Sequence, residues 1–255
     1  MGFNALDGWS WIGTYGGYYL QADLLQSFEH GFFTRQWLGR EPEELAACIS
    51  AGVSVHRTRQ VHGSTVIAAS DAAAAPWPEA DGLVSDGGAQ SLWVCGADCT
   101  PVLIADPASG RVAACHAGWR GVAGRILPEA VAALEALGGR REDLLVALGP
   151  AVSGAEYQVE RMVSLEVAAS LEVGASGQPD LSAIRDCGGL ADDPEPSRDR
   201  LDIRAATRQQ LINEGLSAER ISVCPLCTVG EPLLFHSWRR DRVRAVQWSG
   251  IVAQA

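Results

Sequence analysis

The chain has 255 residues, of which 47% are hydrophobic and 20% are charged. This length and composition are typical of an ordinary water-soluble protein that can bury a large core. The formal net charge of −11 argues against nucleic acid or an anionic membrane as the main partner, because no basic field would attract phosphate backbones. A small phosphorylated ligand held by a few local arginines is still compatible with this charge.

The sequence carries no pattern typical of export or membrane insertion. Its first residues have neither a basic start nor a long apolar segment, so we expect no secretory signal. No uninterrupted apolar run reaches the roughly 18 residues of a membrane span. The cysteines number seven, which is odd, and without a signal peptide this predicts reduced thiols and a cytoplasmic location.

The first third of the chain is predicted to contain strands and one short helix. Apolar and alternating runs predict strands at Tyr18–Leu24 and Val53–Arg59, with a helix at Glu41–Ser50 between them. Arg35 ends an apolar run, where a surface ion pair is a common role. His62 lies against a glycine, where the backbone can turn sharply and expose the imidazole. A lone histidine is more often structural, so its role depends on its neighbours.

Three acidic residues then flank a short apolar strand, namely Glu79, Asp81 and Asp86. Solvation at the surface explains most such acids. A general base among them is the less favoured interpretation.

The stretch Cys95–Gly121 carries most of the reactive side chains. Val102–Ala105 and Val112–Cys115 are predicted strands, joined by a turn rich in Asp, Pro, Ser and Gly. If these strands pair as a hairpin, Cys99 and His116 lie close together despite their separation in sequence. Two further polar residues flank the same strand ends, namely Asp98 and Arg120.

The second half is predicted to add helices at Val122–Leu137 and from Leu201 to about Glu214, a buried strand at Leu144–Leu148, and a last strand at Val243–Ser249. Residues 174–200 are rich in Gly, Pro, Asp and Arg without any period. We expect them to form one long mobile loop within a single domain that spans residues 1–255.

Several interpretations of the cysteines and histidines are open from the residues alone. His62, Cys99 and His116 form a donor set that suits zinc and leaves a fourth position free. Cys99 is alternatively a nucleophile that His116 activates and Asp98 orients. A structural zinc site of four cysteines is also conceivable, although its spacing fits poorly: Cys95, Cys99, Cys224 and Cys227. Inert core cysteines are the remaining possibility.

The supply of histidine excludes one class of enzyme. A multicopper oxidase needs about ten imidazole ligands, many in closely spaced pairs such as His-x-His. The chain has five histidines, and no two of them form such a pair. We therefore expect no true laccase chemistry.

Seven motifs appear in order along the chain: Gln60-Val-His-Gly63, Ala80-Asp-Gly-Leu-Val-Ser-Asp86, Ala97-Asp-Cys-Thr-Pro101, His116-Ala-Gly-Trp-Arg-Gly121, Leu148-Gly-Pro150 with Tyr157-Gln-Val159, Cys227-Thr228 and Phe235-His-Ser-Trp-Arg-Arg-Asp241. Over roughly residues 28–250 the sequence resembles the laccase-domain family. This family is also called the multicopper polyphenol oxidase or purine nucleoside phosphorylase family.

The resemblance implies an α+β fold, a single-domain α/β/β/α layered sandwich with mixed β-sheets. It implies a metal site made by His62, Cys99 and His116, with zinc as the expected cofactor and copper less favoured. It further implies phosphorolysis of adenosine, inosine, guanosine and S-methyl-5′-thioadenosine, with adenosine deamination as a second activity. The expected partners are therefore a small nucleoside and phosphate, while the sequence is silent on oligomeric state.

Residue roles follow from this chemistry. Arg35, Arg120 and Arg239 are the candidates for holding phosphate against the ribose, and Asp98 is a candidate for orienting a histidine or handling a proton. The alternative activity is a cysteine hydrolase or amidase that edits peptidoglycan precursors with Cys99 and His116. A copper-dependent polyphenol oxidase is disfavoured by the histidine count, and a non-enzymatic regulator is the third possibility.

Overall fold

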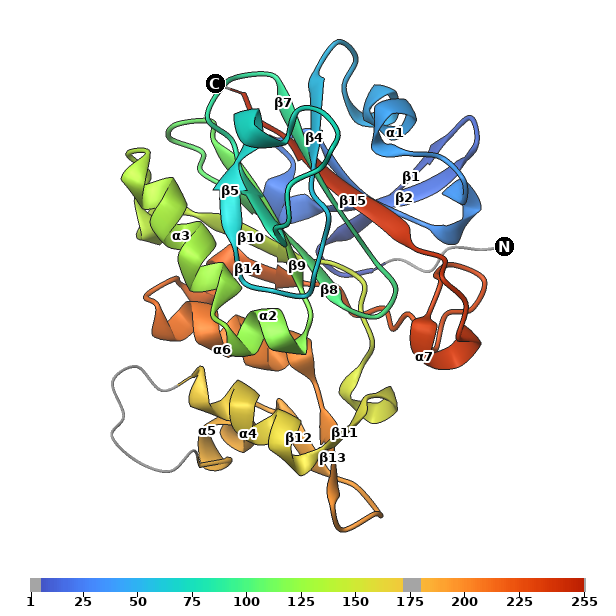
Figure 1. Ribbon diagram of the computed structural model, residues 1–255, viewed down its shortest axis with the longest axis vertical. Coiled ribbons are helices and arrows are strands. Elements are labelled where there is room, and N and C mark those ends of the chain that lie inside the picture. Colours follow the sequence, from blue (N-terminus) through green and yellow to red (C-terminus); the bar gives the residue numbers. More distant parts are fainter. Residues whose placement is uncertain (1–5, 172–179, 255) are drawn as a thin grey trace.

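Two six-stranded β-sheets pack face to face at the centre of the molecule, and helices cover their outer faces (Figure 1). The computed structural model describes residues 6–171 and 180–254. Its layers confirm the predicted α+β fold with an α/β/β/α arrangement of mixed sheets.

The first sheet is antiparallel except for one parallel pair, β4 with β7. Its strands, in spatial order, are β1 (Trp9–Thr14), β2 (Gly17–Ala22), β3 (His30–Phe33), β15 (Gln247–Val252), β7 (Gln90–Gly96) and β4 (Ser54–Arg57). Helix α1 (Pro42–Ile49) covers the outer face, where Leu45 packs with Phe33 and Trp93. The helix begins at Pro42 because proline suits the first turn and a Glu41–Glu44 capping box satisfies its free N–H groups.

The second sheet contains the predicted hairpin. Its strands, in spatial order, are β14 (Ile221–Val223), β10 (Leu145–Leu148), β8 (Thr100–Ala105), β9 (Val112–Ala117), β6 (Gly82–Val84) and β5 (Val66–Ala68). β8 and β9 pair antiparallel, with Pro101 opposite His116. The register therefore confirms that the chain brings Cys99, which precedes β8, close to His116.

The core explains why β8 is apolar throughout. Val102 and Ile104 face the layer of helices, whereas Leu103 and Ala105 face the other sheet. Successive side chains of a strand point to opposite faces, and both faces of this strand are covered. Helices α3 (Ile126–Ala136) and α6 (Ile203–Asn213) supply the outer cover.

The helix that the sequence predicts over 122–137 is two helices. α2 (Trp119–Ala123) ends at Gly124, and α3 begins after Arg125, whose φ of 64° is left-handed. Pro128 lies in the first turn of α3, where its missing N–H costs no helical hydrogen bond. The final strand likewise begins at Gln247, not at Val243.

The prediction of one long loop over 174–200 is wrong for the part that the structure describes. From residue 181 onward, Ile184, Leu190 and Leu201 pack into the helix-covered core and order the backbone. This region contains α5 (Ser182–Asp186), β12 (Leu190–Asp192) and β13 (Arg198–Leu201), which join β11 (Gln158–Glu160) and α4 (Arg161–Ala169) at the lower end of Figure 1. Residues 174–179 lie outside the described residues. None of the helices described is both long and apolar enough to cross a bilayer.

Candidate functional site

Three side chains that are remote in sequence meet where the hairpin ends. The possible metal-binding atoms of His62, Cys99 and His116 all lie within 4.8 Å of one another. The two imidazole rings are nearly perpendicular, at 84°, with their centroids 4.8 Å apart. His62 is exposed, Cys99 half-buried and His116 buried, so the cluster opens to solvent on the His62 side.

Asp81 holds both histidines in place. Its carboxylate accepts hydrogen bonds from the backbone N–H groups of Val61, His62 and Gly63, at 3.1, 3.0 and 2.7 Å. The same carboxylate lies 2.8 Å from Nδ1 of His116. Burial acts to raise the pKa of Asp81, but these hydrogen bonds to its charged form together outweigh burial and hold the pKa below its usual value. One buried acid thus sets the turn that carries His62 and the orientation of the His116 ring.

Gln60 fixes the same turn to the other sheet. Its side-chain amide accepts from the backbone N–H of Cys95 at 2.8 Å and donates to the Cys95 carbonyl at 2.7 Å. His62 follows with φ of 60°, the left-handed region that non-glycine residues seldom adopt. Because Cys95 is in β7 and Asp81 precedes β6, the turn is held by both sheets at once.

The electrostatics of the cluster favour a thiolate. Burial would raise the pKa of Cys99, but the imidazoles of His116 and His62 lower it to about 6. Burial would lower the pKa of His116, but the Cys99 thiolate and Asp81 raise it to about 9. Both shifts favour a thiolate at Cys99, and the thiolate is the form that binds metals.

The donor set fits a metal ion of borderline softness. Nδ1 of His116 is engaged by Asp81, which leaves Nε2 as the free donor, as in carboxylate–histidine–metal arrangements. Two imidazoles and one thiolate leave a fourth coordination position open. Gly118 keeps the sulfur accessible, because a Cβ at this position would lie 2.9 Å from Cys99 Sγ.

The four-cysteine alternative is not formed. Among the residues that the structure describes, His62, Cys99 and His116 are the only group of three or more potential metal ligands gathered in this way. Cys224 is fully buried, and burial raises its pKa to about 12. All seven cysteines are free.

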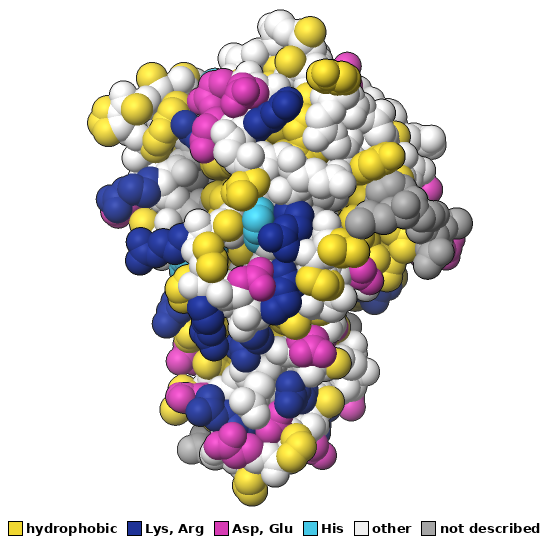
Figure 2. Space-filling model, turned by 90° about the vertical axis from the view of Figure 1, so that its right-hand side faces the viewer, with side chains coloured by type: hydrophobic (Ala, Val, Ile, Leu, Met, Phe, Trp, Pro, Cys, Tyr) yellow, Lys and Arg dark blue, Asp and Glu magenta, His cyan; other side chains and the backbone are white. Residues whose placement is uncertain are grey.

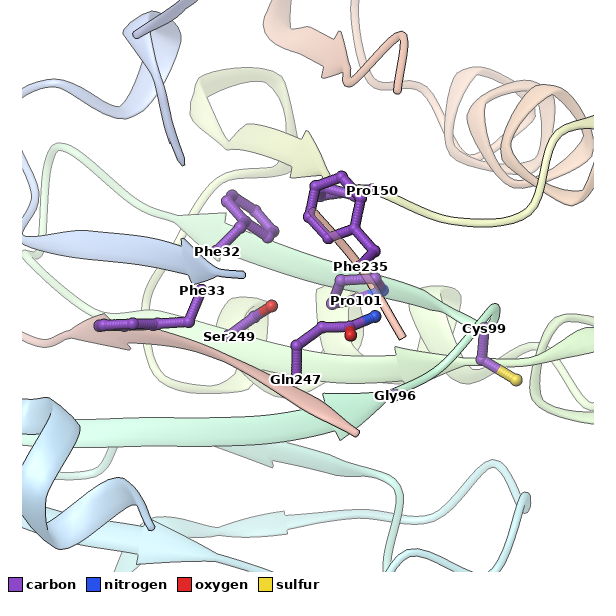
Figure 3. Close-up of a pocket in the computed structure, with 9 residues that line it drawn as sticks. All are labelled: Phe32, Phe33, Gly96, Cys99, Pro101, Pro150, Phe235, Gln247 and Ser249. Carbon is purple, nitrogen blue, oxygen red and sulfur yellow. The ribbon is translucent and has the colours of Figure 1, made fainter. Parts of the chain in front are cut away.

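Two cavities adjoin Cys99. One lies behind its backbone, and the thiol points away from the aromatic rings and prolines that line it (Figure 3); the lining residues are Phe32, Phe33, Gly96, Cys99, Pro101, Pro150, Phe235, Gln247 and Ser249. The other is lined by Asp98, Cys99, Gly118, Trp119, Val152, Tyr157 and Ile203. This second cavity is called the Tyr157 pocket below. Because Gly118 faces the Cys99 sulfur, it is the cavity that lies beside the candidate metal ligands.

Two of the three predicted phosphate-binding arginines lie near the Tyr157 pocket. The guanidinium carbon of Arg239 is 4.8 Å from the centroid of the Tyr157 ring, and that of Arg120 is 4.4 Å from the Trp119 ring. Neither arginine forms an ion pair with any residue described in the structure. Figure 2 shows arginine, acidic and hydrophobic side chains around an exposed histidine near the middle of the face in view.

Arg35 is placed differently. Its guanidinium donates to the Pro232 carbonyl at 2.5 Å, and its charge lowers the pKa of His236, whose burial acts in the same direction and more strongly. Arg35 is therefore a support for the segment before α7 (Trp238–Asp241). It does not line the Tyr157 pocket.

Asp98 lines the Tyr157 pocket but does not orient either site histidine. Its carboxylate accepts from the Thr228 hydroxyl at 2.6 Å and from the Arg239 backbone N–H at 2.7 Å. The histidine-orienting role for which Asp98 was a candidate belongs to Asp81.

Sequence reasoning missed the roles of Gln60, Asp81 and Tyr157. Each lies in one of the family motifs, but no spacing rule predicted its function. For Asp81 the sequence shows only that it directly precedes a short apolar strand; the pairing of Gly82 with Cys115, which brings Asp81 beside His116, is seen only in the structure.

Comparison with known proteins supports the motif-based assignment. The family model described as multi-copper polyphenol oxidoreductase laccase matches residues 39–254. A purine nucleoside phosphorylase of Synechocystis sp. is 40% identical over 258 residues, covering 97% of this chain and 98% of that protein. A purine nucleoside phosphorylase of Mycobacterium tuberculosis is 36% identical, covering 77% of this chain and 72% of that protein.

Solved structures share the fold at lower sequence identity. YlmD from Geobacillus stearothermophilus is 24% identical, with a TM-score of 0.79 over 93% of this chain and 96% of that chain. The YfiH protein of Bacillus licheniformis, also 24% identical, has a TM-score of 0.78 over 92% of this chain and 96% of that chain. At this identity the likeness concerns the fold alone.

Proposed function

The chain belongs to the multi-copper polyphenol oxidoreductase laccase family, and we propose that it is a zinc-dependent purine nucleoside phosphorylase. The proposal rests on one observation: a His–Cys–His cluster lies next to a pocket with two arginines beside it, and neither arginine forms an ion pair with the residues that the structure describes. The names of its relatives point to the same activity. The proposed substrates are adenosine, inosine, guanosine and S-methyl-5′-thioadenosine, together with inorganic phosphate.

Zinc is favoured over a set of copper ions because two of the five histidines are occupied by hydrogen bonds within the fold. Both ring nitrogens of His30 are engaged by backbone groups, of Phe28 and Ala22. Both ring nitrogens of His56 are also engaged, by Ala69 and Ser54. Of five histidines, these two are therefore committed to the fold, which leaves far fewer than the roughly ten that multicopper chemistry needs.

The chain's own residues supply the binding of the anion. In phosphorolysis a phosphate oxygen bonds to ribose C1′ while the C1′–N9 bond breaks, and the purine leaves with the electron pair and takes up a proton. Arg120 and Arg239 would hold the phosphate, since guanidinium groups match its oxygens in pairs. Burial, and then the negative charge at Cys99, raise the pKa of Tyr157 to about 12. The Tyr157 hydroxyl is therefore neutral at pH 7, and the ring lies against the guanidinium of Arg239.

His62, Cys99 and His116 would hold the zinc ion, which supplies a Lewis acid with an open position for substrate or water. Asp81 keeps the proton on Nδ1 of His116 and so directs Nε2 into the cluster. Adenosine deamination is the second activity that we propose for this site. We place the enzyme in the cytoplasm, because its cysteines are odd in number and all free.

One observation favours a second candidate. The lowered pKa of Cys99 beside His116 is also what a nucleophilic cysteine needs, which fits a hydrolase or amidase acting on peptidoglycan precursors. Cys99→Ser distinguishes the two roles. Loss of bound zinc indicates a ligand, whereas loss of activity with zinc retained indicates a nucleophile.

The deciding experiment is product analysis of the purified protein with adenosine, with and without phosphate, with Cys99→Ser as the control. Adenine and ribose 1-phosphate that form only with phosphate, and not with the variant, support the phosphorylase. Inosine formed without phosphate would make deamination the main activity. Adenosine that is returned unchanged at high enzyme concentration contradicts the proposal and directs attention to amide substrates.

A further inference from the structure

Asp98 has an unusual backbone and an unusually complete set of partners. Its φ of 100° lies in the left-handed half of backbone space, which non-glycine residues seldom adopt. Its side chain is buried, and each carboxylate oxygen accepts one strong hydrogen bond, from Thr228 and from the Arg239 backbone. Its own carbonyl accepts from the N–H of Val152 at 3.0 Å. One residue thus ties three loops together immediately beside Cys99.

The loop that Asp98 holds is the one that carries Arg239. The Arg239 backbone is fixed by the Asp98 carboxylate, and its guanidinium lies over the Tyr157 ring. The next residue, Arg240, donates from its backbone to Ser237, and its guanidinium donates to the carbonyls of Thr228 and Phe235. The backbone around Arg239 is therefore rigid, while its charge has no carboxylate partner among the described residues.

We propose that Asp98 and Tyr157 are positioning residues, which together hold Arg239 at the Tyr157 pocket so that it binds the phosphate substrate. The identity of the anion rests on the proposed phosphorylase function. The positioning itself rests only on the contacts above. Asp98 fixes the backbone of Arg239, and the ring of Tyr157 fixes its guanidinium by a cation–π contact.

This assignment differs from a role for Asp98 in proton transfer. A carboxylate that moves a proton needs a free oxygen facing the reacting atom. Both oxygens of Asp98 are occupied by donors that belong to the fold. The oxygen that accepts from the Arg239 N–H in particular cannot become a donor without losing that bond, because a backbone N–H cannot accept.

The two roles predict opposite results for Asp98→Asn. The introduced amide oxygen can accept from the Arg239 N–H, and the amide nitrogen can donate to the Thr228 hydroxyl, which serves as acceptor after rotation. Asparagine is also among the residues that best tolerate a positive φ. The Asp98→Asn variant would therefore preserve the position of Arg239, although its amide cannot act as an acid or a base.

Two substitutions of Tyr157 separate a role of its ring from a role of its hydroxyl. Tyr157→Phe keeps an aromatic face for Arg239 and removes only the hydroxyl. Tyr157→Leu removes the face. If the ring is the support, phosphate binding survives the first change and not the second.

The experiment measures binding of inorganic phosphate to the metal-loaded protein by calorimetry, together with the KM for phosphate in the phosphorolysis assay. Arg239→Gln and Asp98→Ala should each weaken phosphate binding by about tenfold or more, which is the usual effect of losing a hydrogen bond to a charged group. Asp98→Asn and Tyr157→Phe should remain within about threefold of the wild type. Tyr157→Leu should lose about three- to thirtyfold, the range for a cation–π contact.

Arg244→Gln is the matched control, because it removes the same charge from an exposed position on the same segment. It should leave phosphate binding unchanged. Metal content, measured in every variant, should equal that of the wild type, which also shows that the variant has folded. If Asp98→Ala does not fold, the variants Asp98→Asn, Tyr157→Phe and Tyr157→Leu still decide the question.

The outcomes separate this inference from the proposed function. Wild-type phosphate affinity in Arg239→Gln overturns the inference, even if phosphorolysis is observed. An Asp98→Asn variant that binds phosphate normally but loses kcat as completely as Asp98→Ala also overturns it, in favour of proton transfer. Arginine-dependent phosphate binding without any phosphorolysis supports the positioning and contradicts the phosphorylase.

Discussion

At the scale of single residues, the chemistry of the site depends on a buried acid that the sequence did not single out. Cys99 and His116 could be predicted to meet, because a turn-linked pair of apolar strands carries them at its ends. Asp81 was one of three acids near a strand, and surface solvation was the favoured explanation. Its burial follows from the pairing of β6 with β9, which only the folded structure shows.

Asp81→Asn should release both imidazoles. The carboxylate accepts four hydrogen bonds, and an amide nitrogen in place of one oxygen would face backbone N–H groups that cannot accept from it. We expect metal affinity to fall by about 10–100-fold and stability by about 1–3 kcal/mol. Competition with a chromophoric chelator measures the first quantity, and urea unfolding the second.

Glu79→Gln is the control for this change. Glu79 pairs with Arg59 in an exposed ion pair, and such pairs contribute little. Equal loss of metal affinity in the two variants would show that general charge, not the Asp81 bonds, sustains the site.

At the scale of elements, the hairpin and most strands could be predicted from the sequence. The division of one predicted helix into two, and the short elements within the predicted loop, could not. The split between α2 and α3 depends on a left-handed Arg125 that no propensity signals. The elements between residues 181 and 201 are ordered by a few apolar side chains that contact distant helices. Local composition indicated a loop there because the packing partners lie elsewhere in the chain.

Gly118, the residue before α2, allows the start of this helix to lie close to Cys99, and a substitution tests this close approach. A methyl group at this position would lie 2.9 Å from Cys99 Sγ and 3.6 Å from the His62 ring. Gly118→Ala should therefore displace the thiolate and lower metal affinity by at least about tenfold, while far-ultraviolet circular dichroism stays unchanged. Gly87→Ala is the matched control, since its added methyl group would meet Gln90 at ordinary contact distances of 3.6–3.9 Å. Normal metal affinity in Gly118→Ala would contradict the placement of the sulfur.

The junction of β2 and β3 should be sensitive to acid. Burial lowers the pKa of His30, and in its neutral form Nε2 accepts the N–H of Ala22. Because the folded-state pKa lies below the unfolded value of about 6.5, the unfolded state takes up the proton first. His30 therefore costs stability as pH falls below about 6.5, by at most about 1.4 kcal/mol per pH unit.

Urea unfolding between pH 5 and pH 7 measures this effect. His30→Gln should be less stable than the wild type at pH 7 but should lose less stability on acidification. Parallel pH profiles for the two proteins would show that His30 titrates alike in the folded and unfolded states.

At the scale of the whole molecule, the site exists because two sheets are packed together. The turn that carries His62 is bound to one sheet through Gln60 and to the other through Asp81. The layered fold, and the meeting of the three candidate metal ligands, could be predicted from the family motifs. The anchoring of the turn could not, because it depends on where the two sheets face each other.

The central claim is that His62, Cys99 and His116 bind one zinc ion. Elemental analysis of the purified wild type beside Cys99→Ser tests it most directly. We predict about one zinc per chain in the wild type, little copper, and loss of the zinc in the variant. Several copper ions per chain, or zinc retained in full by Cys99→Ser, would contradict the account.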